Sequence, residues 1–130
     1  MIDTNIFISS ILYPLSDIAK VVAHVKKHHT IVICERILNE LERVFKEKFS
    51  AKIDDMYENI EFLVDEFHTK DSMDYSKYPQ ISDPNDIPIL ANAIEARIDI
   101  FITGDKDFQD VKLVKPRILT PRKYFEDFVN

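Results

Sequence analysis

Apolar residues recur along this chain at two spacings, and each spacing predicts a different kind of element. Where apolar side chains stand three and four positions apart, the pattern is typical of helices that bury one face. This spacing predicts helices over residues 5–12, 17–28, 35–48 and 53–68. We expect a further helix to begin near Pro84 or Pro88 and to run to about Arg97. A last helix is expected to begin at Pro121, because proline suits the first helical position.

Short runs of β-branched and aromatic residues between these helices predict buried strands. They lie at residues 1–4, 30–33 and 100–103, with weaker candidates at 113–114 and 118–119, whereas residues 71–83 are expected to be irregular. Short buried strands that alternate with helices are typical of a parallel sheet with both faces covered. We therefore expect an α/β fold over residues 1–130, a single domain with a short, mostly parallel central sheet flanked by helices on both faces.

Composition limits the classes of protein that this chain can represent. The sequence holds one cysteine, Cys34, which cannot form an intrachain disulfide and is expected to be a small buried residue. Neither a membrane span nor a signal peptide is visible, so we expect a cytoplasmic protein. The net charge of −6 argues against a nonspecific nucleic-acid binder, but less strongly if several acids are gathered around bound cations.

Two acidic residues follow the ends of predicted strands. Asp3 ends the first strand, and Asp105 follows residues 100–103 after Gly104, the only glycine of the chain. In a parallel sheet ligands bind at the carboxyl ends of the strands, so both carboxylates are expected at one edge. We expect Gly104 to permit a sharp turn that directs Asp105 over the sheet. The alternative is that Asp3 and Asp105 are ordinary turn or cap residues.

Two further acids are expected to lie on the inward faces of helices. Glu40 stands three residues after Ile37 and four before Val44, so it shares their buried stripe. Asp86 precedes Ile89 by three residues and is in line with the inward face of its helix. The alternatives are a structural salt bridge for Glu40 and a helix cap for Asp86.

Carboxylates that share a pocket repel one another, and a hard divalent cation removes the conflict. Carboxylate oxygens with water suit Mg²⁺ or Mn²⁺, and no histidine–cysteine cluster with the spacing of a zinc site is present. Asp107 is close enough in sequence to Asp105 to support such an ion. The C-terminal quarter is rich in basic residues that could follow an RNA backbone, among them Lys106, Arg122 and Lys123.

Four segments taken in order resemble the PIN-domain family. They are Asp3-Thr4-Asn5, the Glu40-Leu41 pair on a helix, Asp86 at the start of an alanine-containing helix, and Thr103-Gly104-Asp105. The end of the chain, Thr120-Pro121-Arg122-Lys123-Tyr124-Phe125, is similar to the usual ending of the family. The chain departs from the family pattern in having only two residues before Asp3, where the first strand is usually longer.

The resemblance implies a metal-dependent ribonuclease, and specifically the toxin of a toxin–antitoxin pair with an antitoxin protein as partner. It implies that Asp3, Glu40, Asp86 and Asp105 are the catalytic metal-site acids and that Asp107 is a fifth. Asn5 and Thr103 would orient them. Apolar residues in 6–12, in 53–68 and near the C-terminus exceed the obvious needs of one core, so we also expect a homodimer.

Two alternatives differ in chemistry. One is a catalytically inactive PIN-like module that binds RNA or protein, which the short first strand favours. The other is an aspartyl-phosphate phosphatase with Asp3 as nucleophile, which usually needs a second acid where this chain has Asn5.

Overall fold

The computed structural model describes residues 1–69 and 73–129. The helices are α1 (Thr4–Leu12), α2 (Asp17–His28), α3 (Glu35–Lys48), α4 (Ile53–Leu63), α5 (Ile87–Glu95), α6 (Lys106–Gln109) and α7 (Pro121–Tyr124). The strands are β1 (Val32–Cys34), β2 (Glu66–His68), β3 (Ile100–Ile102) and β4 (Arg117–Leu119). Single 3₁₀ turns lie at Ser50–Lys52, Tyr75–Lys77 and Pro84–Asp86, and a π-helical turn, Phe125–Val129, continues α7.

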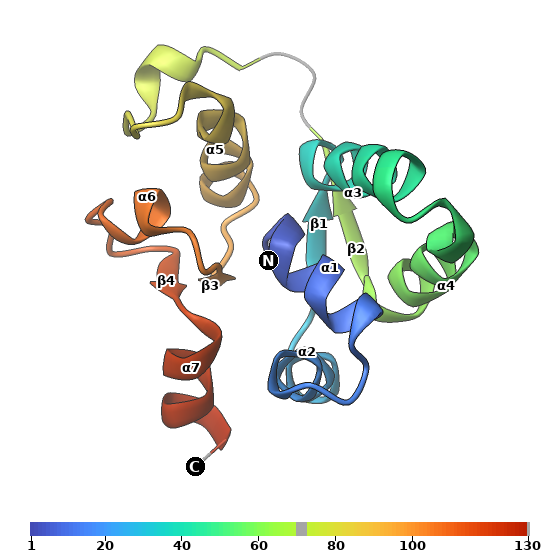
Figure 1. Cartoon of the computed structure of the whole chain (residues 1–130). Coiled ribbons are helices and arrows are strands. Elements are labelled where there is room, and N and C mark those ends of the chain that lie inside the picture. The colour runs from blue at the N-terminus through green and yellow to red at the C-terminus, as the bar shows by residue number, and fades with distance from the viewer. Residues whose placement is uncertain (70–72, 130) are drawn as a thin grey trace.

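All the strand pairs in the described ranges are parallel, as the sequence predicted. β1 pairs with β2, and β3 pairs with β4. The start of the chain adds to β3 through a parallel bridge between Ile2 and Ile102. Figure 1 shows α1 to α4 gathered around β1 and β2, and α5 to α7 on the side of β3 and β4. The chain has the predicted α/β fold, with short parallel strands among helices, but the described strands form two separate two-stranded sheets instead of one central sheet. The acids discussed below lie at the carboxyl edge of the sheet formed by β3 and β4.

The contact between the N-terminus and β3 fixes which residues end at the same edge. The Asp3 amide donates to the Ile102 carbonyl at 2.9 Å, and the Ile102 amide donates to the Met1 carbonyl at 3.0 Å. The Thr103 amide in turn donates to the Leu119 carbonyl of β4. Because these segments run in the same direction, Asp3 and the residues after Ile102 leave the sheet together.

The predicted helix over 53–68 is wrong at residues 64–68, because α4 ends at Leu63 and residues 66–68 form β2. Hydrogen bonds between Asp65, Glu66 and Ile31 hold the link between the end of α4 and the start of β2. Its carboxylate accepts a hydrogen bond from the Ile31 amide, and its own amide and that of Glu66 donate to the Ile31 carbonyl. Pairing with β1 overrides the helical spacing of the apolar residues, a tertiary effect that spacing alone does not report.

Two other predictions need correction or completion. Residues 113–114 are not a strand: Val114 is 96% exposed, and β4 pairs only with the three residues of β3. Part of the segment expected to be irregular, residues 71–72, lies outside the described residues. Pro121 does open α7, as predicted, and the side chain of Thr120 caps that helix.

The hydrophobic core forms where the inward stripes of the helices meet the strands. Its largest fully buried side chains include Phe7 of α1, Phe45 of α3, Phe101 of β3 and Phe108 of α6. Phe101 and Phe108 meet edge to face, with ring centroids 5.0 Å apart. Cys34 is buried as expected, and burial raises the pKa of its thiol. This packing holds β3, and hence the residues that follow it, in place.

No single helix of the described residues is long and apolar enough to cross a membrane. α1 and α2 together have the length and composition of a span, but the chain bends by 110° between them.

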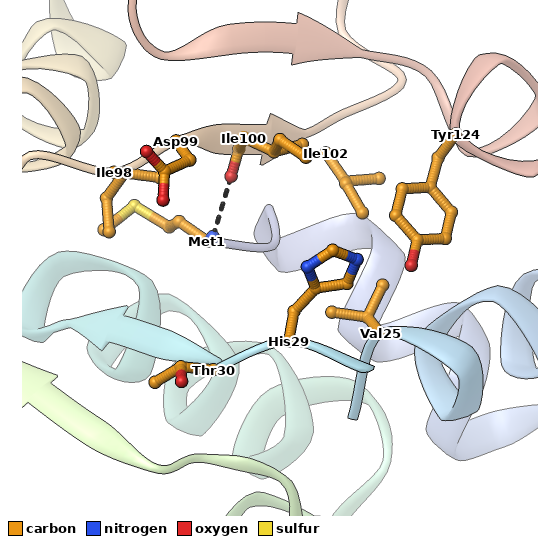
Figure 2. A pocket seen from close by; sticks show the side chains of 9 residues that line it. All are labelled: Met1, Val25, His29, Thr30, Ile98, Asp99, Ile100, Ile102 and Tyr124. Carbon is orange, nitrogen blue, oxygen red and sulfur yellow. Dashed lines mark hydrogen bonds between the residues drawn. The ribbon is translucent and has the colours of Figure 1, made fainter. Parts of the chain in front are cut away.

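The α-amine of Met1 lies in an unusual environment. It donates a 2.9 Å hydrogen bond to the Ile100 carbonyl beside a cavity of about 170 Å³ (Figure 2). Burial lowers the pKa of this amine to about 5, against a smaller opposing effect of the Asp99 carboxylate. A buried amine is therefore neutral near pH 7 in the folded protein and protonated in the unfolded chain.

We expect this amine to make the protein more stable as the pH rises from 6 to 8. In that window the unfolded state binds more protons than the folded state, so the free energy of unfolding increases by at most about 1.4 kcal/mol per pH unit. Chemical denaturation at several pH values measures the slope. Protein acetylated at Met1 should lose this contribution, because an amide nitrogen does not titrate in this range. Equal slopes for the two forms would contradict the prediction.

Candidate metal and nuclease site

Asp3 is a buried carboxylate at the carboxyl edge of the sheet. It is 7% exposed and stands immediately before α1. Its Oδ2 accepts a 2.7 Å hydrogen bond from the Thr103 hydroxyl, and its Oδ1 accepts a 2.8 Å bond from the Thr4 amide. Burial raises the pKa of Asp3, these two hydrogen bonds oppose the rise, and the charges of Glu40 and Asp105 add to it. Asp3 is thus both a helix cap and a carboxylate held close to other acids.

Thr103 connects the ends of the two adjacent parallel segments. Its hydroxyl donates to Asp3 and accepts a 3.0 Å hydrogen bond from the Asp105 amide. Asp105 in turn accepts a 2.9 Å bond from the Asp107 amide and caps α6. A side chain that is fully buried and bonded on both sides fixes the direction in which the chain leaves β3.

The expected role of Gly104 is wrong. No glycine has a positive φ, and a Cβ at Gly104 would meet nothing within 4 Å. The hydrogen bond from the Asp105 amide to the Thr103 hydroxyl makes the turn, so a glycine is not needed there.

Asp86 lies where the turn Pro84–Asp86 passes into α5. Asp83 caps that turn by accepting a hydrogen bond from the Asn85 amide, whereas the Asp86 carboxylate makes no capping hydrogen bond at the start of α5. Burial is the largest cause that raises the pKa of Asp86 to about 6, and the charges of Asp83, Asp105, Asp3 and Glu40 contribute to this rise in that order. The capping alternative for Asp86 therefore has no hydrogen bond to support it.

Three of the predicted acids form a tight cluster. One carboxylate oxygen from each of Asp86, Asp105 and Asp107 lies within 4.8 Å of the other two, and all three residues are half-buried. Asp107 reaches the cluster because α6 begins directly after Asp105. Oxygen atoms at this separation from three carboxylates suit a hard divalent cation, which would offset their mutual repulsion.

Glu40 of α3 lies outside this cluster of three acids, as does Asp3, but it is bonded to the residue after Asp3, which the sequence analysis gave no role. The Thr4 hydroxyl donates a 2.6 Å hydrogen bond to Glu40 Oε2. Arg36 Nε lies 4.0 Å from Glu40 Oε1, too far for a strong ion pair, and the Glu40 side chain is 29% exposed. The place of Thr4 directly after Asp3, in a motif already noted, was the signal that could have identified it.

Asn5 and the basic residues do not join the acids. Asn5 is exposed, and within the described ranges its side chain hydrogen-bonds to none of the acids. Arg122 pairs with Glu126 and Lys123 with Asp127, while Lys106 has no ion-pair partner in the described part of the chain. Two of the three predicted RNA-binding cations are therefore engaged with neighbouring carboxylates.

Comparison with known protein families shows to which family this chain belongs. A family model described as a PIN domain matches residues 1–107, a range that contains Asp3, Glu40, Asp86, Asp105 and Asp107. The chain belongs to the PIN-domain family. The part outside the match begins at Phe108 and includes β4, α7 and the paired cations Arg122 and Lys123.

A solved structure extends the likeness in fold to most of the chain. This PIN domain is similar to a chain of VapBC2 from Rickettsia felis, whose crystal structure was determined bound to a DNA fragment from their promoter. The TM-score is 0.66 at 18% sequence identity, over 92% of this chain and 96% of the other. No curated protein matches the sequence. At this identity the match establishes the shared fold.

Replacing Asp86 by asparagine should stabilise the metal-free protein. Because the folded-state pKa is raised, the folded protein binds more protons than the unfolded chain between about pH 4 and 6, and its stability falls as the pH rises through this window. At pH 7.5 with a chelator, we expect Asp86→Asn to increase the free energy of unfolding by roughly 1 kcal/mol, a value reduced for solvent screening. Chemical denaturation measures it.

Asp110→Asn is the matched control, because Asp110 is an exposed acid just beyond the cluster. It should change stability by less than about 0.5 kcal/mol. Added Mg²⁺ should raise the melting temperature of the wild type and of Asp110→Asn more than that of Asp86→Asn. A destabilised Asp86→Asn variant with an unchanged Mg²⁺ response would remove Asp86 from the site.

Proposed function

We propose that this PIN domain, acting as one unit over residues 1–130, is a divalent-metal-dependent endoribonuclease that hydrolyses RNA phosphodiester bonds. The observation that carries the proposal is the convergence of acids on one edge of the sheet. Asp86, Asp105 and Asp107 share a cluster, and the charges of Asp3 and Glu40 act on Asp86. A structural role alone does not account for carboxylates gathered so closely that burial and the neighbouring negative charges raise the pKa values of Asp3 and Asp86.

The donor set fits Mg²⁺ or Mn²⁺. All its members are carboxylates, and the nearest cation, Arg36, is too distant to neutralise Glu40 fully. We propose Asp3, Glu40, Asp86, Asp105 and Asp107 as the residues that hold the metal. When bound, such an ion lowers the pKa of a water molecule and stabilises charge on an attacked phosphate.

Neighbouring residues of the chain hold the acidic side chains in position. Thr103 holds the Asp3 carboxylate from one side, and Thr4 holds Glu40 from the other. Phe101 and Phe108, which precede and follow the turn at residues 103–105, are buried and meet edge to face, so both ends of that turn are anchored in the core. We propose Thr4 and Thr103 as positioning residues, and we no longer include Asn5 among them because it is exposed.

The basic residues of the C-terminal segment provide little free positive charge that could attract RNA. The C-terminal cations mostly face Glu126 and Asp127, and the net charge is −6. We therefore propose that the metal supplies most of the positive charge that meets the substrate, with Lys106 as the exposed lysine next to the site.

The proposal extends to the protein's biological role. We propose that the chain is the toxin of a toxin–antitoxin pair in the cytoplasm, with an antitoxin protein as partner. The family resemblance of its motifs and the similarity of its fold to a VapBC2 chain support this. The alternative is a catalytically inactive PIN-like module that binds RNA or protein without cutting it.

The experiment for the proposed activity is cleavage of labelled single-stranded RNA by the purified chain. Cleavage should need Mg²⁺ or Mn²⁺, should stop with a chelator, and should fall to background in Asp86→Asn. Thr4→Val keeps the shape of the side chain but frees Glu40, and should lower activity roughly 10- to 100-fold. Thr69→Val, at an exposed threonine bonded to Glu35, should leave activity unchanged. A folded protein that binds the RNA and never cuts it would favour the inactive module.

We also propose a homodimer, although the expected interface has changed. Ile6, Phe7 and Ile11 of the first helix are core residues and are not available for an interface. Exposed apolar side chains remain in the other two expected regions, at Phe62 of α4 and at Phe125, and Leu15 before α2 is 90% exposed. We propose that the interface includes Leu15 and a groove between α2 and the C-terminal segment, whose lining combines apolar residues with Asp17, Lys20, Arg122 and Glu126.

Light scattering at tens of micromolar should give twice the chain mass of 15.3 kDa. Leu15→Asp should shift the protein toward monomer, because it places a charge in an apolar contact. Phe62→Asp, at another exposed apolar residue on α4, is the control. A monomeric wild type at these concentrations would contradict the homodimer.

A further inference from the structure

A second group of metal-ligating side chains lies away from the acids, at the C-terminal end of α2. His24 and His28 stand one helical turn apart, with ring centroids separated by 4.2 Å and planes tilted by 34°. His29 follows them and packs edge-on against Tyr124 and Phe128 of the C-terminal segment. Figure 2 shows His29 beside Met1 and Tyr124, near the start of β3. These histidines therefore border the C-terminal segment, whereas the acidic cluster lies at the starts of α5 and α6.

Tyr124 holds one of the two imidazoles in a defined orientation. Its hydroxyl shares a 2.8 Å hydrogen bond with His24 Nδ1, and Tyr124 itself is fully buried between α2 and β4. When Nδ1 donates to the hydroxyl, the lone pair of His24 is on Nε2, the nitrogen that faces away from Tyr124. Histidines that bind metals usually donate their other ring N–H to such a partner, which fixes the tautomer and the ring.

The surroundings of His24 favour the neutral imidazole, which is the form that binds a metal. Partial desolvation lowers the pKa of His24, and the positive charges of His28, His29 and Lys27 lower it further. Both rings are accessible to solvent, since His24 is half-buried and His28 is exposed. A cation could therefore reach both nitrogens without any movement of the core.

We propose that His24 and His28 form a binding site for a divalent cation that prefers nitrogen ligands, such as Zn²⁺, Ni²⁺ or Cu²⁺, with water completing its coordination. Two imidazoles one turn apart on a helix present their nitrogens on the same face. Imidazole suits these ions, whereas the carboxylates of the acidic cluster suit Mg²⁺ or Mn²⁺. Because Tyr124 orients His24, an ion bound here would also strengthen the contact between α2 and α7.

Calorimetric titration with ZnCl₂ tests the site on the full chain. The double variant Asp86→Asn/Asp105→Asn serves as the background, because it removes two carboxylates that could also bind zinc. In this background we expect one zinc ion per chain. His28→Ala should weaken the binding by about 10-fold or more, and Tyr124→Phe, which removes the orienting hydroxyl, by roughly 10-fold. His68→Ala should have no effect, because His68 bonds to Asn92 on a different part of the molecule.

Two outcomes would overturn the proposal. The first is that the background variant binds no zinc, and the second is that His28→Ala leaves the zinc affinity of the background variant unchanged. If Tyr124→Phe unfolds the protein, the comparison of His28→Ala with His68→Ala still decides, because neither side chain belongs to the core. The test does not depend on nuclease activity, so it stands or falls separately from the proposed ribonuclease.

Discussion

The parallel contact between residues 1–3 and β3 is the interaction on which the acidic site depends. The backbone hydrogen bonds that join Asp3 to Ile102 bring two segments about a hundred positions apart in sequence to one edge. Thr103 then completes the contact through its side chain, since its hydroxyl joins the Asp3 carboxylate to the Asp105 amide. Loss of this register by one residue would turn Asp3 to the other face of the sheet and separate it from the cluster.

The same contact makes the site electrostatically costly without a cation. It places Asp3 in a buried environment, and it places the charges of Asp3, Glu40, Asp83 and Asp105 close enough to raise the pKa of Asp86. Hydrogen bonds from Thr4 and Thr103 offset part of this cost, and the core beneath the turn supports the rest. Such arrangements are typical of functional sites, where stability is lost so that charges can be held in a useful geometry.

The protein therefore carries two groups of potential metal-binding side chains that differ in chemical type. One group consists of carboxylates that lie directly before α1, α5 and α6 or within α3 and α6, whereas the other consists of the histidines at the C-terminal end of α2 and the buried Tyr124 of α7. The basic residues of the C-terminal segment serve mainly to pair with Asp127, Glu126 and Asp99, which ties β4 and the last helix to their surroundings. Within the described ranges, Lys115, Arg117 and Arg122 have carboxylate partners, whereas no ion pair engages Asp86 or Asp105.

The sequence by itself determined most of the helices and the parallel pairing of the strands, and it singled out Asp86, Asp105 and Asp107, which the structure places close together. These properties rest on local patterns: the spacing of Ile37, Leu41 and Phe45, or an acid placed directly after a short β-branched run. It also correctly predicted that Pro121 opens the last helix, because proline acts on its own backbone.

Only the tertiary structure decided the features that depend on contacts between distant segments. Residues 66–68 have a helical spacing but become β2, because Asp65 and Ile31 exchange hydrogen bonds that set the pairing with β1. Thr4 positions Glu40, and Asn5 does not, because the start of α1 turns one side chain inward and the next toward solvent. The turn after β3 comes from the Thr103 hydroxyl and not from Gly104, since the orientation of that hydroxyl depends on Asp3 at the other end of the sequence. Spacing along the chain reports which face a residue shares, but hydrogen bonds across the fold determine what it meets there.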